Sequence, residues 1–275
     1  MSETSVITRI EPSRAWLGLG LGDLWRYREL LYFLTWRDVK VRYKQTAIGV
    51  FWAVLQPALT TVIFAVVFSQ VARFESKSLP YPLYVLSGML PWLFVYNAIT
   101  FAANSLVGNT NLVTKVYFPR LIVPLAAVLA GLIDLALGFL ILVGVMFWYG
   151  VHLTAQIALT PLFLLLSVLV ALAFGTLFSA LNVRFRDVKF ALPFVLQVWM
   201  FVSPIFYPLD ILSERARFVI ALNPLTGVLH GFRASLFGEQ FNSQVIAISL
   251  IGTILLLILS LFVFRNMEDS FADEI

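Results

Sequence analysis

Basic side chains are most concentrated in the stretch Leu24–Lys44, where they alternate with aromatic ones. Arg37, Lys40 and Lys44 recur at spacings of three and four residues, so on a helix they would share one face. Guanidinium and ammonium groups form charge-assisted hydrogen bonds to phosphate. The pattern indicates either a docking platform at the cytoplasmic mouth or a generic basic anchor whose bases face lipid phosphates, and the residue types alone leave both open.

The neighbouring helical face of this stretch is aromatic and apolar. Its members follow spacings of 7, 4, 3 and 4 residues: Trp25, Tyr32, Trp36, Val39 and Tyr43. A helix with aromatic rings on one face and bases on the next is expected to lie in the headgroup plane of a membrane. We therefore predict an amphipathic interface helix over Leu24–Lys44, within a cytoplasmic N-terminal segment, residues 1–45.

Asp134 is the only carboxylate well inside a long apolar segment. Placing an aspartate at the centre of a membrane helix costs about 2.5–3.5 kcal/mol. A proton relay would need a second ionisable partner, and the interior of no other apolar segment supplies one. We therefore predict that Asp134 is a buried structural acceptor, with a relay as the alternative.

A stripe of polar and small residues follows the segment Leu83–Ala103 and its continuation. The spacings are 3, 4, 4 and 3 residues for Asn97, Thr100, Asn104, Gly108 and Asn111. Amide side chains that face lipid are costly, so the stripe should face other helices or water. Hydrogen bonding between helices and the lining of a pathway both fit, and the same alternatives apply to Gln197.

Aromatic side chains gather near the predicted external ends of two apolar segments. Those that we consider as channel or gate residues are Trp92, Trp199, Phe201, Phe206 and Tyr207. An aromatic belt at the membrane interface is the default explanation of such a cluster. Flat amphipathic rings would also suit contact with sugars, and composition does not separate the two interpretations.

The sequence contains no recognisable catalytic constellation. It has no cysteine and only two histidines, which leaves no Cys-ligated metal or iron–sulfur site and no His-rich metal cluster. No glycine-rich loop followed by Lys-Ser or Lys-Thr is present to cradle a nucleotide phosphate. We predict neither catalytic nor metal-binding residues and no cofactor in this chain, and no nucleic-acid partner.

The elements that position these residues must lie in a membrane. The 275 residues are 60% hydrophobic and 12% charged, whereas soluble domains have about 45–50% apolar and about 25% charged residues. About 20 apolar helical residues cross a bilayer core of roughly 30 Å. Five segments meet this length: Ile48–Ser69, Leu83–Ala103, Leu121–Tyr149, Ile157–Leu181 and Val245–Phe264.

A sixth segment, Phe190–Leu209, is long enough but contains three prolines. Proline removes a backbone donor that lipid cannot replace, so this span is expected to be kinked or broken and packed against protein. Two short apolar runs follow it, Phe218–Leu222 and Leu225–Phe237, and neither can cross the bilayer. We predict short helices there that lie in the interface or dip into it.

Basic residues set the orientation of these spans. With the N-terminus inside, fourteen of the nineteen Lys and Arg residues lie on the cytoplasmic side. No cleavable signal peptide is expected at the start. The predicted architecture is all-α: an interface helix, a six-span domain over residues 46–265 with short external re-entrant or gate helices between spans five and six, and an acidic cytoplasmic tail over residues 266–275.

Several short motifs, in order along the chain, resemble the membrane subunit of ABC-2-type exporters for O-antigen, capsule or teichoic acid. Arg37–Trp52 (RDVKVRYKQTAIGVFW) is similar to the family signature RDxKxRYK…LGxxW, with Ile48 where leucine is usual. Further matches are Phe118-Pro119-Arg120, the run Asn182–Asp187, Ser203–Tyr207, and Leu222-Asn223-Pro224 with Arg233. The similarity extends over about Leu30 to Phe264.

The resemblance implies a homodimer in a bacterial inner membrane, with both termini cytoplasmic, that binds a separate ATPase subunit carrying ATP and Mg²⁺. It implies that a lipid-linked glycan, of the undecaprenyl-pyrophosphate type, meets the cytoplasmic mouth at Arg37, Lys40, Arg42, Tyr43 and Lys44. It also implies an external gate in the short helices, with Asn223 and Arg233. The implied ATPase-coupling residues are Lys115, Tyr117, Phe118, Pro119, Arg120, Arg184, Phe185, Arg186 and Asp187.

Two alternatives remain open at this point. An ABC-2 exporter of a small lipid or drug would keep the same architecture, and accumulation of a lipid-linked glycan in a deletion strain would argue against it. An ion-coupled secondary transporter would need Asp134 as its coupling site and would work without an ATPase.

Overall fold

A computed structural model describes residues 21–44, 55, 59–60, 62–63 and 79–274, and their regular elements are helices. Most of the predicted first span, Ile48–Ser69, lies outside the described residues. The helices are α1 (Leu21–Arg26), α2 (Arg28–Lys44), α4 (Tyr81–Gly108), α5 (Thr110–Lys115), α6 (Ile122–Ala130), α7 (Leu132–Trp148), η1 (Ala155–Leu159), α8 (Thr160–Arg184), α9 (Val188–Val202), η2 (Leu209–Ile211), α10 (Glu214–Ala221), α11 (Pro224–Phe237), α12 (Ser243–Glu268) and α13 (Phe271–Glu274).

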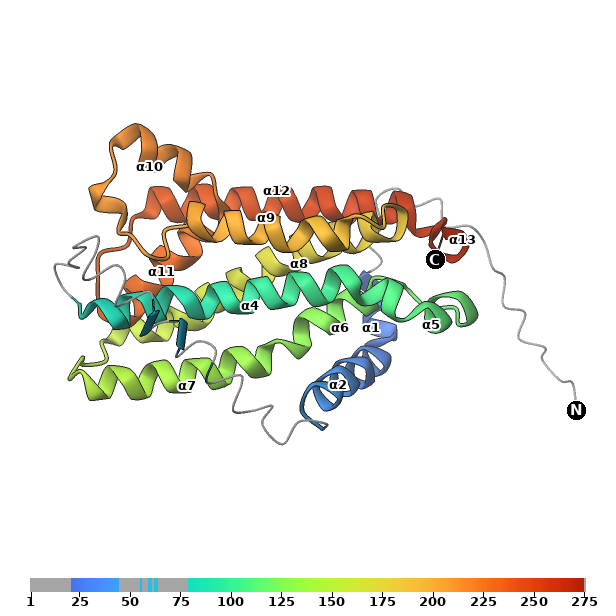
Figure 1. Cartoon of the computed structure of the whole chain (residues 1–275), viewed down its shortest axis with the longest axis horizontal. Helices are drawn as coiled ribbons and strands as arrows, with labels where there is room; N and C mark the ends of the chain where they lie inside the picture. Colours follow the sequence, from blue (N-terminus) through green and yellow to red (C-terminus); the bar gives the residue numbers. More distant parts are fainter. Residues whose placement is uncertain (1–20, 45–54, 56–58, 61, 64–78, 275) are drawn as a thin grey trace, which may run out of the picture.

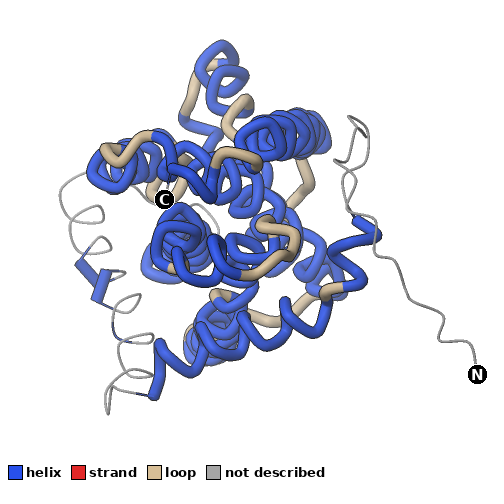
Figure 2. Tube along the Cα trace, turned by 90° about the vertical axis from the view of Figure 1, so that its right-hand side faces the viewer, coloured by secondary structure: helices blue, strands red, loops and turns tan. Residues whose placement is uncertain are grey.

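The long helices run side by side along the long axis of the molecule (Figure 1). α5, α13 and the C-terminus gather at one end, here called the α5 end, and α10 and α11 gather at the other, the α11 end. Figure 2 views the bundle from its α5 end. α4 packs against α8, α6 and α7, while α8 also packs against α12. The loops that we predicted to be cytoplasmic are therefore found together at one end.

Four helical stretches in the described part of the chain are long and apolar enough to cross a membrane. They are Tyr81–Gly108, Ile122–Trp148, Ala155–Arg184 and Ser243–Glu268. The fifth predicted span is shorter than expected, because α9 has 15 residues and so rises only about 22 Å. Its helix ends at Val202, directly before Ser203-Pro204, whereas Pro193 stays inside it. The structure thus places the break in this segment after Val202.

Close backbone approach depends on small residues between the helices. A Cβ atom added at Gly231 of α11 would overlap the ring of Phe163 in α8, and one at Gly227 would lie 2.5 Å from Ser249 in α12. At Gly175 of α8 it would lie 2.8 Å from Ala102 of α4. Such packing is the usual way in which membrane helices associate, because lipid offers no hydrophobic driving force between them.

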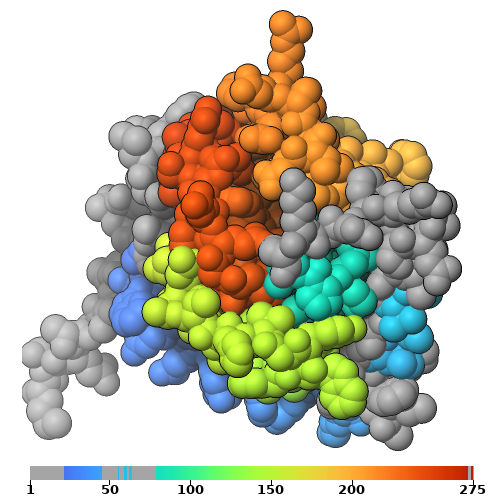
Figure 3. All heavy atoms as spheres, turned by 90° about the vertical axis from the view of Figure 1, so that its left-hand side faces the viewer, coloured from blue at the N-terminus to red at the C-terminus, as the bar shows by residue number. Residues whose placement is uncertain are grey.

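Local sequence signals explain where the helices at the α11 end start and stop. The Asn223 side chain accepts the Leu225 N–H at 3.0 Å, and Pro224 occupies the first turn of α11, where no N–H is needed. Gly238 ends the helix at φ +71°, a conformation that glycine adopts without strain. Asn242 then caps α12 through the Val245 N–H. α10, which exposes Phe218 and Val219, projects from the bundle at this end (Figure 3).

Candidate functional site

The helix α2 has one packed and one open face. Leu34 and Val39 are buried, and α2 packs against α6. The open face carries Tyr32 and Trp36, which are 62% and 45% exposed. Trp25, 72% exposed, lies in α1 instead, because the predicted helix Leu24–Lys44 is interrupted at Tyr27. Val39, predicted on the aromatic face, points into the bundle instead because it lies at the edge of that face, next to the packed side.

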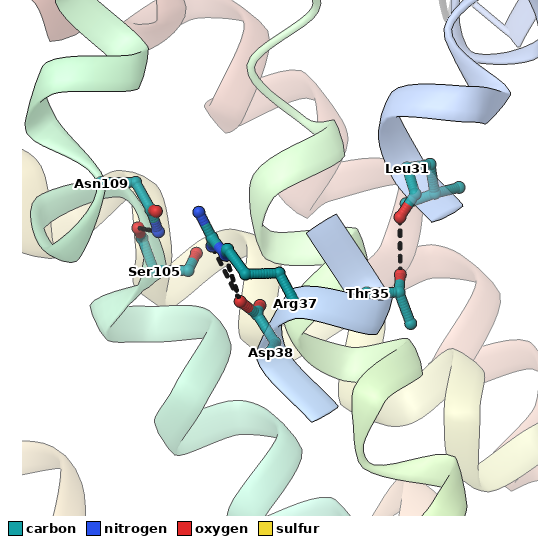
Figure 4. A network of polar contacts seen from close by, with 6 residues as sticks. All are labelled: Leu31, Thr35, Arg37, Asp38, Ser105 and Asn109. Atoms are coloured by element: carbon teal, nitrogen blue, oxygen red, sulfur yellow. Dashed lines mark hydrogen bonds and ion pairs between the residues drawn. The ribbon is translucent and has the colours of Figure 1, made fainter. Parts of the chain in front are cut away.

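Three of the predicted phosphate-contact bases lie on the open face of α2. Arg37 is paired with Asp38 at 2.8 Å and points toward Ser105 of α4 and Asn109, which directly follows that helix (Figure 4). The Lys40 ammonium lies over the ring of Trp36, 5.5 Å from its centroid. Lys44 is exposed at the end of α2. On the open side of α2 the bases and the aromatic rings therefore adjoin one another, with Lys40 in contact with Trp36.

The other two predicted contacts, Arg42 and Tyr43, turn toward α7. The Arg42 guanidinium forms an ion pair with one carboxylate oxygen of Asp134, and the Tyr43 hydroxyl donates to the other. Arg42 also lies over the Phe101 ring of α4, 4.3 Å from its centroid. Burial and the hydrogen bond to Asp134 raise the pKa of Tyr43, so its hydroxyl keeps its proton and acts as a donor. We call Arg42, Tyr43, Phe101 and Asp134 the Asp134 cluster.

The two loops predicted to couple to an ATPase both lie at the α5 end. Phe118 is buried in the chain itself, with 5% of its surface exposed, whereas Tyr117 is 85% and Phe185 53% exposed. The Arg184 guanidinium lies over the Phe185 ring at 5.6 Å. Lys115, Arg186 and Asp187 are exposed as well, and Pro119 is half-buried. We call Lys115, Tyr117, Arg184, Phe185 and Arg186 the α5-end surface.

The last predicted coupling residue, Arg120, is held by the end of α12. Its backbone N–H donates to the Glu268 carboxylate at 3.0 Å, and its guanidinium donates to the Glu268 carbonyl. Phe271 of α13 is fully buried and packs edge-on against Phe264, with centroids 5.2 Å apart. The predicted acidic tail over residues 266–275 therefore packs in part, and Phe271, the one aromatic residue of that run, is the sequence signal that could have indicated it.

At the α11 end, the buried side chain of Arg233 uses all five of its N–H donors on uncharged acceptors. Nε donates to Ser87 Oγ at 3.3 Å, Nη1 to the Tyr84 hydroxyl at 2.8 Å and Pro204 O at 2.7 Å, and Nη2 to Tyr84 O at 3.2 Å and Ile205 O at 2.7 Å. Burial lowers the pKa of Arg233, yet a guanidinium remains protonated at physiological pH.

These bonds belong to a larger arrangement around the turn after α9. Tyr81 donates to Phe206 O at 2.8 Å and Tyr84 to Tyr207 O at 3.0 Å. Together with Arg233, side chains of α4 and α11 thus satisfy four consecutive carbonyls, from Pro204 to Tyr207. Non-helical backbone at membrane depth requires such internal partners. We call Tyr81, Tyr84, Ser87 and Arg233 with this turn the Arg233 cluster.

Several predicted channel or gate residues are interior to the protomer. Trp92, Phe206 and Arg233 have 2%, 2% and 4% of their surface exposed, so they line no open surface of this conformation. Trp199 packs between Trp92 and Phe174, at centroid distances of 5.7 and 4.6 Å. Its indole N–H donates to Asn223 at 2.9 Å. The sequence predicted these rings near the external ends of two apolar segments but did not decide which side of each segment lies against protein.

The remaining candidates keep some access to the surface. Asn104, Gln197 and Phe201 are exposed, and Asn97 and Tyr207 are half-buried. The buried Asn182 of α8 donates to Ala103 O at 2.9 Å and to Asn104 at 3.3 Å. For Asn104, therefore, hydrogen bonding between helices and exposure on the polar stripe occur together.

Comparisons with known proteins show which transporters the chain resembles. Residues 29–237, from α2 through α11, match the family model described as ABC-2 type transporter. The chain is 28% identical to an O-antigen export system permease protein, RfbA, of Myxococcus xanthus, over 92% of this chain and 98% of the relative. It is 27% identical to an RfbA of Klebsiella pneumoniae over 89% and 94%, and 22% identical to the polysialic acid transport protein KpsM of Escherichia coli over 85% and 92%.

Proposed function

The chain belongs to the ABC-2 type transporter family, and we propose that it is the channel-forming permease subunit of an exporter for a lipid-linked cell-surface polysaccharide. The observation that carries this proposal is similarity along 92% of the chain to a protein named for O-antigen export. The substrate would move from the cytoplasm to the outside of a bacterial inner membrane, with both chain termini in the cytoplasm. In this scheme the α5 end faces the cytoplasm and the α11 end faces outward.

A separate ATPase subunit supplies the energy in this proposal and holds the ATP and Mg²⁺. Its docking site would be the α5-end surface, where the exposed rings of Tyr117 and Phe185 lie among basic side chains. Exposed aromatic rings are frequent anchors of protein interfaces. Arg120 and Phe118 would instead transmit movement inward, because both are held by the bundle.

The open face of α2 would receive the substrate at the cytoplasmic mouth. Arg37, Lys40 and Lys44 are accessible there, and their charges suit a pyrophosphate group. The rings of Trp36 and Tyr32 beside them favour a position at the headgroup level. The exposed position of these bases supports the substrate-entrance role that the resemblance of Arg37–Trp52 to the family signature suggests.

Two copies of the chain would form the pathway, because a long glycan needs a continuous channel rather than an enclosed pocket. The polar stripe of α4, with Asn97 and Asn104, and Gln197 of α9 are the accessible polar residues that could line it. The pair α10 and α11, anchored by the Arg233 cluster, would close its outer end.

The proposal is tested by deleting the gene and, separately, by purifying the tagged chain. We expect the deletion strain to accumulate undecaprenyl-linked glycan on the cytoplasmic side of the membrane. We also expect the purified chain to bring down an ATPase subunit and to show no ATPase activity alone. Normal surface glycan in the deletion strain, with loss of drug or lipid efflux, would favour an exporter of small molecules. Transport that survives deletion of every associated ATPase would contradict the ABC mechanism.

A further inference from the structure

Asp134 lies in the first turn of α7, just after the break at Gly131 that separates α6 from α7. Its side chain is 23% exposed, so it is only partly accessible from the surface. The partial positive charge at the start of α7 stabilises a carboxylate in this position. Inserting an ionisable side chain into a membrane-spanning stretch costs free energy, so such a residue usually has a structural or functional role.

The partners of Asp134 come from outside the spans. Arg42 and Tyr43 are the third-last and second-last residues of α2, and each binds a different oxygen of the carboxylate. Because Phe101 of α4 packs against the Arg42 guanidinium, the cluster joins three elements at one point. Leu34 and Val39 hold the middle of α2 by apolar packing, whereas the Asp134 cluster holds its C-terminal end through charge and hydrogen bonding.

We propose that Asp134 is a positioning residue, which fixes the C-terminal end of α2 against the start of α7 and so sets the place of Lys40 and Lys44 at the substrate entrance. Arg42 and Tyr43 are then tethers and not contacts of the substrate phosphate. The link from Asp134 to the substrate entrance rests on the proposed function, whereas the positioning of α2 by Asp134 is independent of it. Bidentate capture of one carboxylate by two consecutive residues restrains both the distance and the rotation of a helix end.

Pulsed electron paramagnetic resonance tests this positioning directly. The native chain contains no cysteine, so pairs of introduced cysteines can carry spin labels without background. One pair is Val41→Cys on α2 with Leu140→Cys on α7, both at positions that are 67% exposed. A second pair, Tyr32→Cys with Leu140→Cys, reports on the part of α2 near Leu34. The measurement uses full-length protein in nanodiscs. An excess of unlabelled chain is mixed in, so that two labelled copies rarely meet in one nanodisc.

In Asp134→Asn we expect the 41–140 distance distribution to broaden and shift to longer distances, with a smaller change for the 32–140 pair. Asp38→Asn is the matched control, because it removes a carboxylate from α2 whose partner is the adjacent Arg37, and it should leave both distributions unchanged. Equal broadening of both pairs would mean that α2 as a whole is displaced, which contradicts local positioning by Asp134.

Arg42→Gln covers the possibility that Asp134→Asn fails to fold, since Arg42 lies on a surface helix. Arg42→Gln should reproduce the broadening of the 41–140 distance distribution, and Tyr43→Phe should broaden it to a smaller extent. The double variant Arg42→Asp with Asp134→Arg, which exchanges the two charges, should give a narrower distribution than Arg42→Asp alone. An unchanged distribution in Arg42→Gln overturns the proposal. Because no transport is measured, this result does not depend on which substrate the chain exports.

Discussion

The Arg233 guanidinium lies over the ring of Tyr84, 3.7 Å from its centroid, and bonds both the hydroxyl and the carbonyl of that residue. The two residues lie 149 positions apart in the chain. The contact joins α11 to α4 at the point where the backbone leaves helical geometry after α9. At the α11 end, the bundle is therefore joined through a buried cation whose donors are all engaged by uncharged groups.

We expect Arg233→Lys to destabilise the protein. Lysine has three donors in place of five, so at least two acceptors lose their partner, and leaving buried acceptors unpaired costs about 2 kcal/mol or more in total. The thermal midpoint in detergent should fall clearly. Arg215→Lys on the exposed part of α10 is the control and should unfold at the wild-type temperature. An unaltered midpoint in Arg233→Lys would show that the cluster contributes no net stability.

Replacing the aromatic residues at the α5 end should separate docking from folding. Tyr117→Ala and Phe185→Ala remove exposed rings, so we expect normal folding and reduced co-purification of the ATPase. Phe118→Ala removes a buried ring and should destabilise the chain by about 3–5 kcal/mol. Arg186→Ala is expected to uncouple ATP hydrolysis from export. Undiminished ATPase binding in the double variant of Tyr117 and Phe185 would place docking elsewhere.

Glu268→Ala should loosen the loop that precedes α6. The variant removes the acceptor of the Arg120 backbone N–H and the partner of Arg265 at 2.8 Å. Hydrogen exchange followed by mass spectrometry should show faster exchange in the peptide that contains Arg120. Asp269→Ala, an exposed neighbour with the same charge, should not. If both variants exchange like the wild type, the contact with Glu268 does not restrain the loop.

Stability should fall as the medium becomes acidic, through His230. Burial lowers the pKa of His230, whose Nε2 accepts the Asn242 N–H at 3.0 Å. The folded chain therefore binds a proton less readily than the unfolded chain, so the contribution is complete above the unfolded pKa of about 6.5 and is lost as pH decreases below it. The midpoint difference between pH 7.5 and 5.5 should shrink in His230→Gln, whereas mutation of the exposed His152 should leave it unchanged.

Reversing charge on the open face of α2 should impair export without preventing membrane insertion. In the variant Arg37→Glu with Lys40→Glu, two accessible cations become repulsive to phosphate. Surface glycan should decrease strongly while the amount of chain in the membrane stays normal. The control reverses Arg215 and Arg217 of α10, at the opposite end of the bundle. Normal export by the α2 variant would refute the phosphate-binding role.

The sequence alone predicted the four long apolar helices that the described residues contain, and it predicted that the loops around Phe118 and Arg186 lie at the same end of them. Those inferences depend on composition over about 20 residues, a local property that tertiary structure cannot change. The break near Ser203-Pro204 and the short helix start at Asn223-Pro224 were predictable for the same reason, since proline and the cap residue act within one turn. The family motifs could also be recognised from the sequence, because each is a short run of consecutive residues.

Only the tertiary structure decided which polar side chains meet. Asp134 lacked an ionisable partner among the interiors of the apolar segments, and its partners, Arg42 and Tyr43, turned out to come from the surface helix, 92 and 91 residues away. Likewise, Trp92 and Arg233 were candidates for a channel, yet both are buried in the protomer. Helical periodicity states which residues share a face, but the neighbour of that face depends on how helices distant in sequence pack. That packing turns Arg42 toward Asp134 and leaves Lys40 exposed.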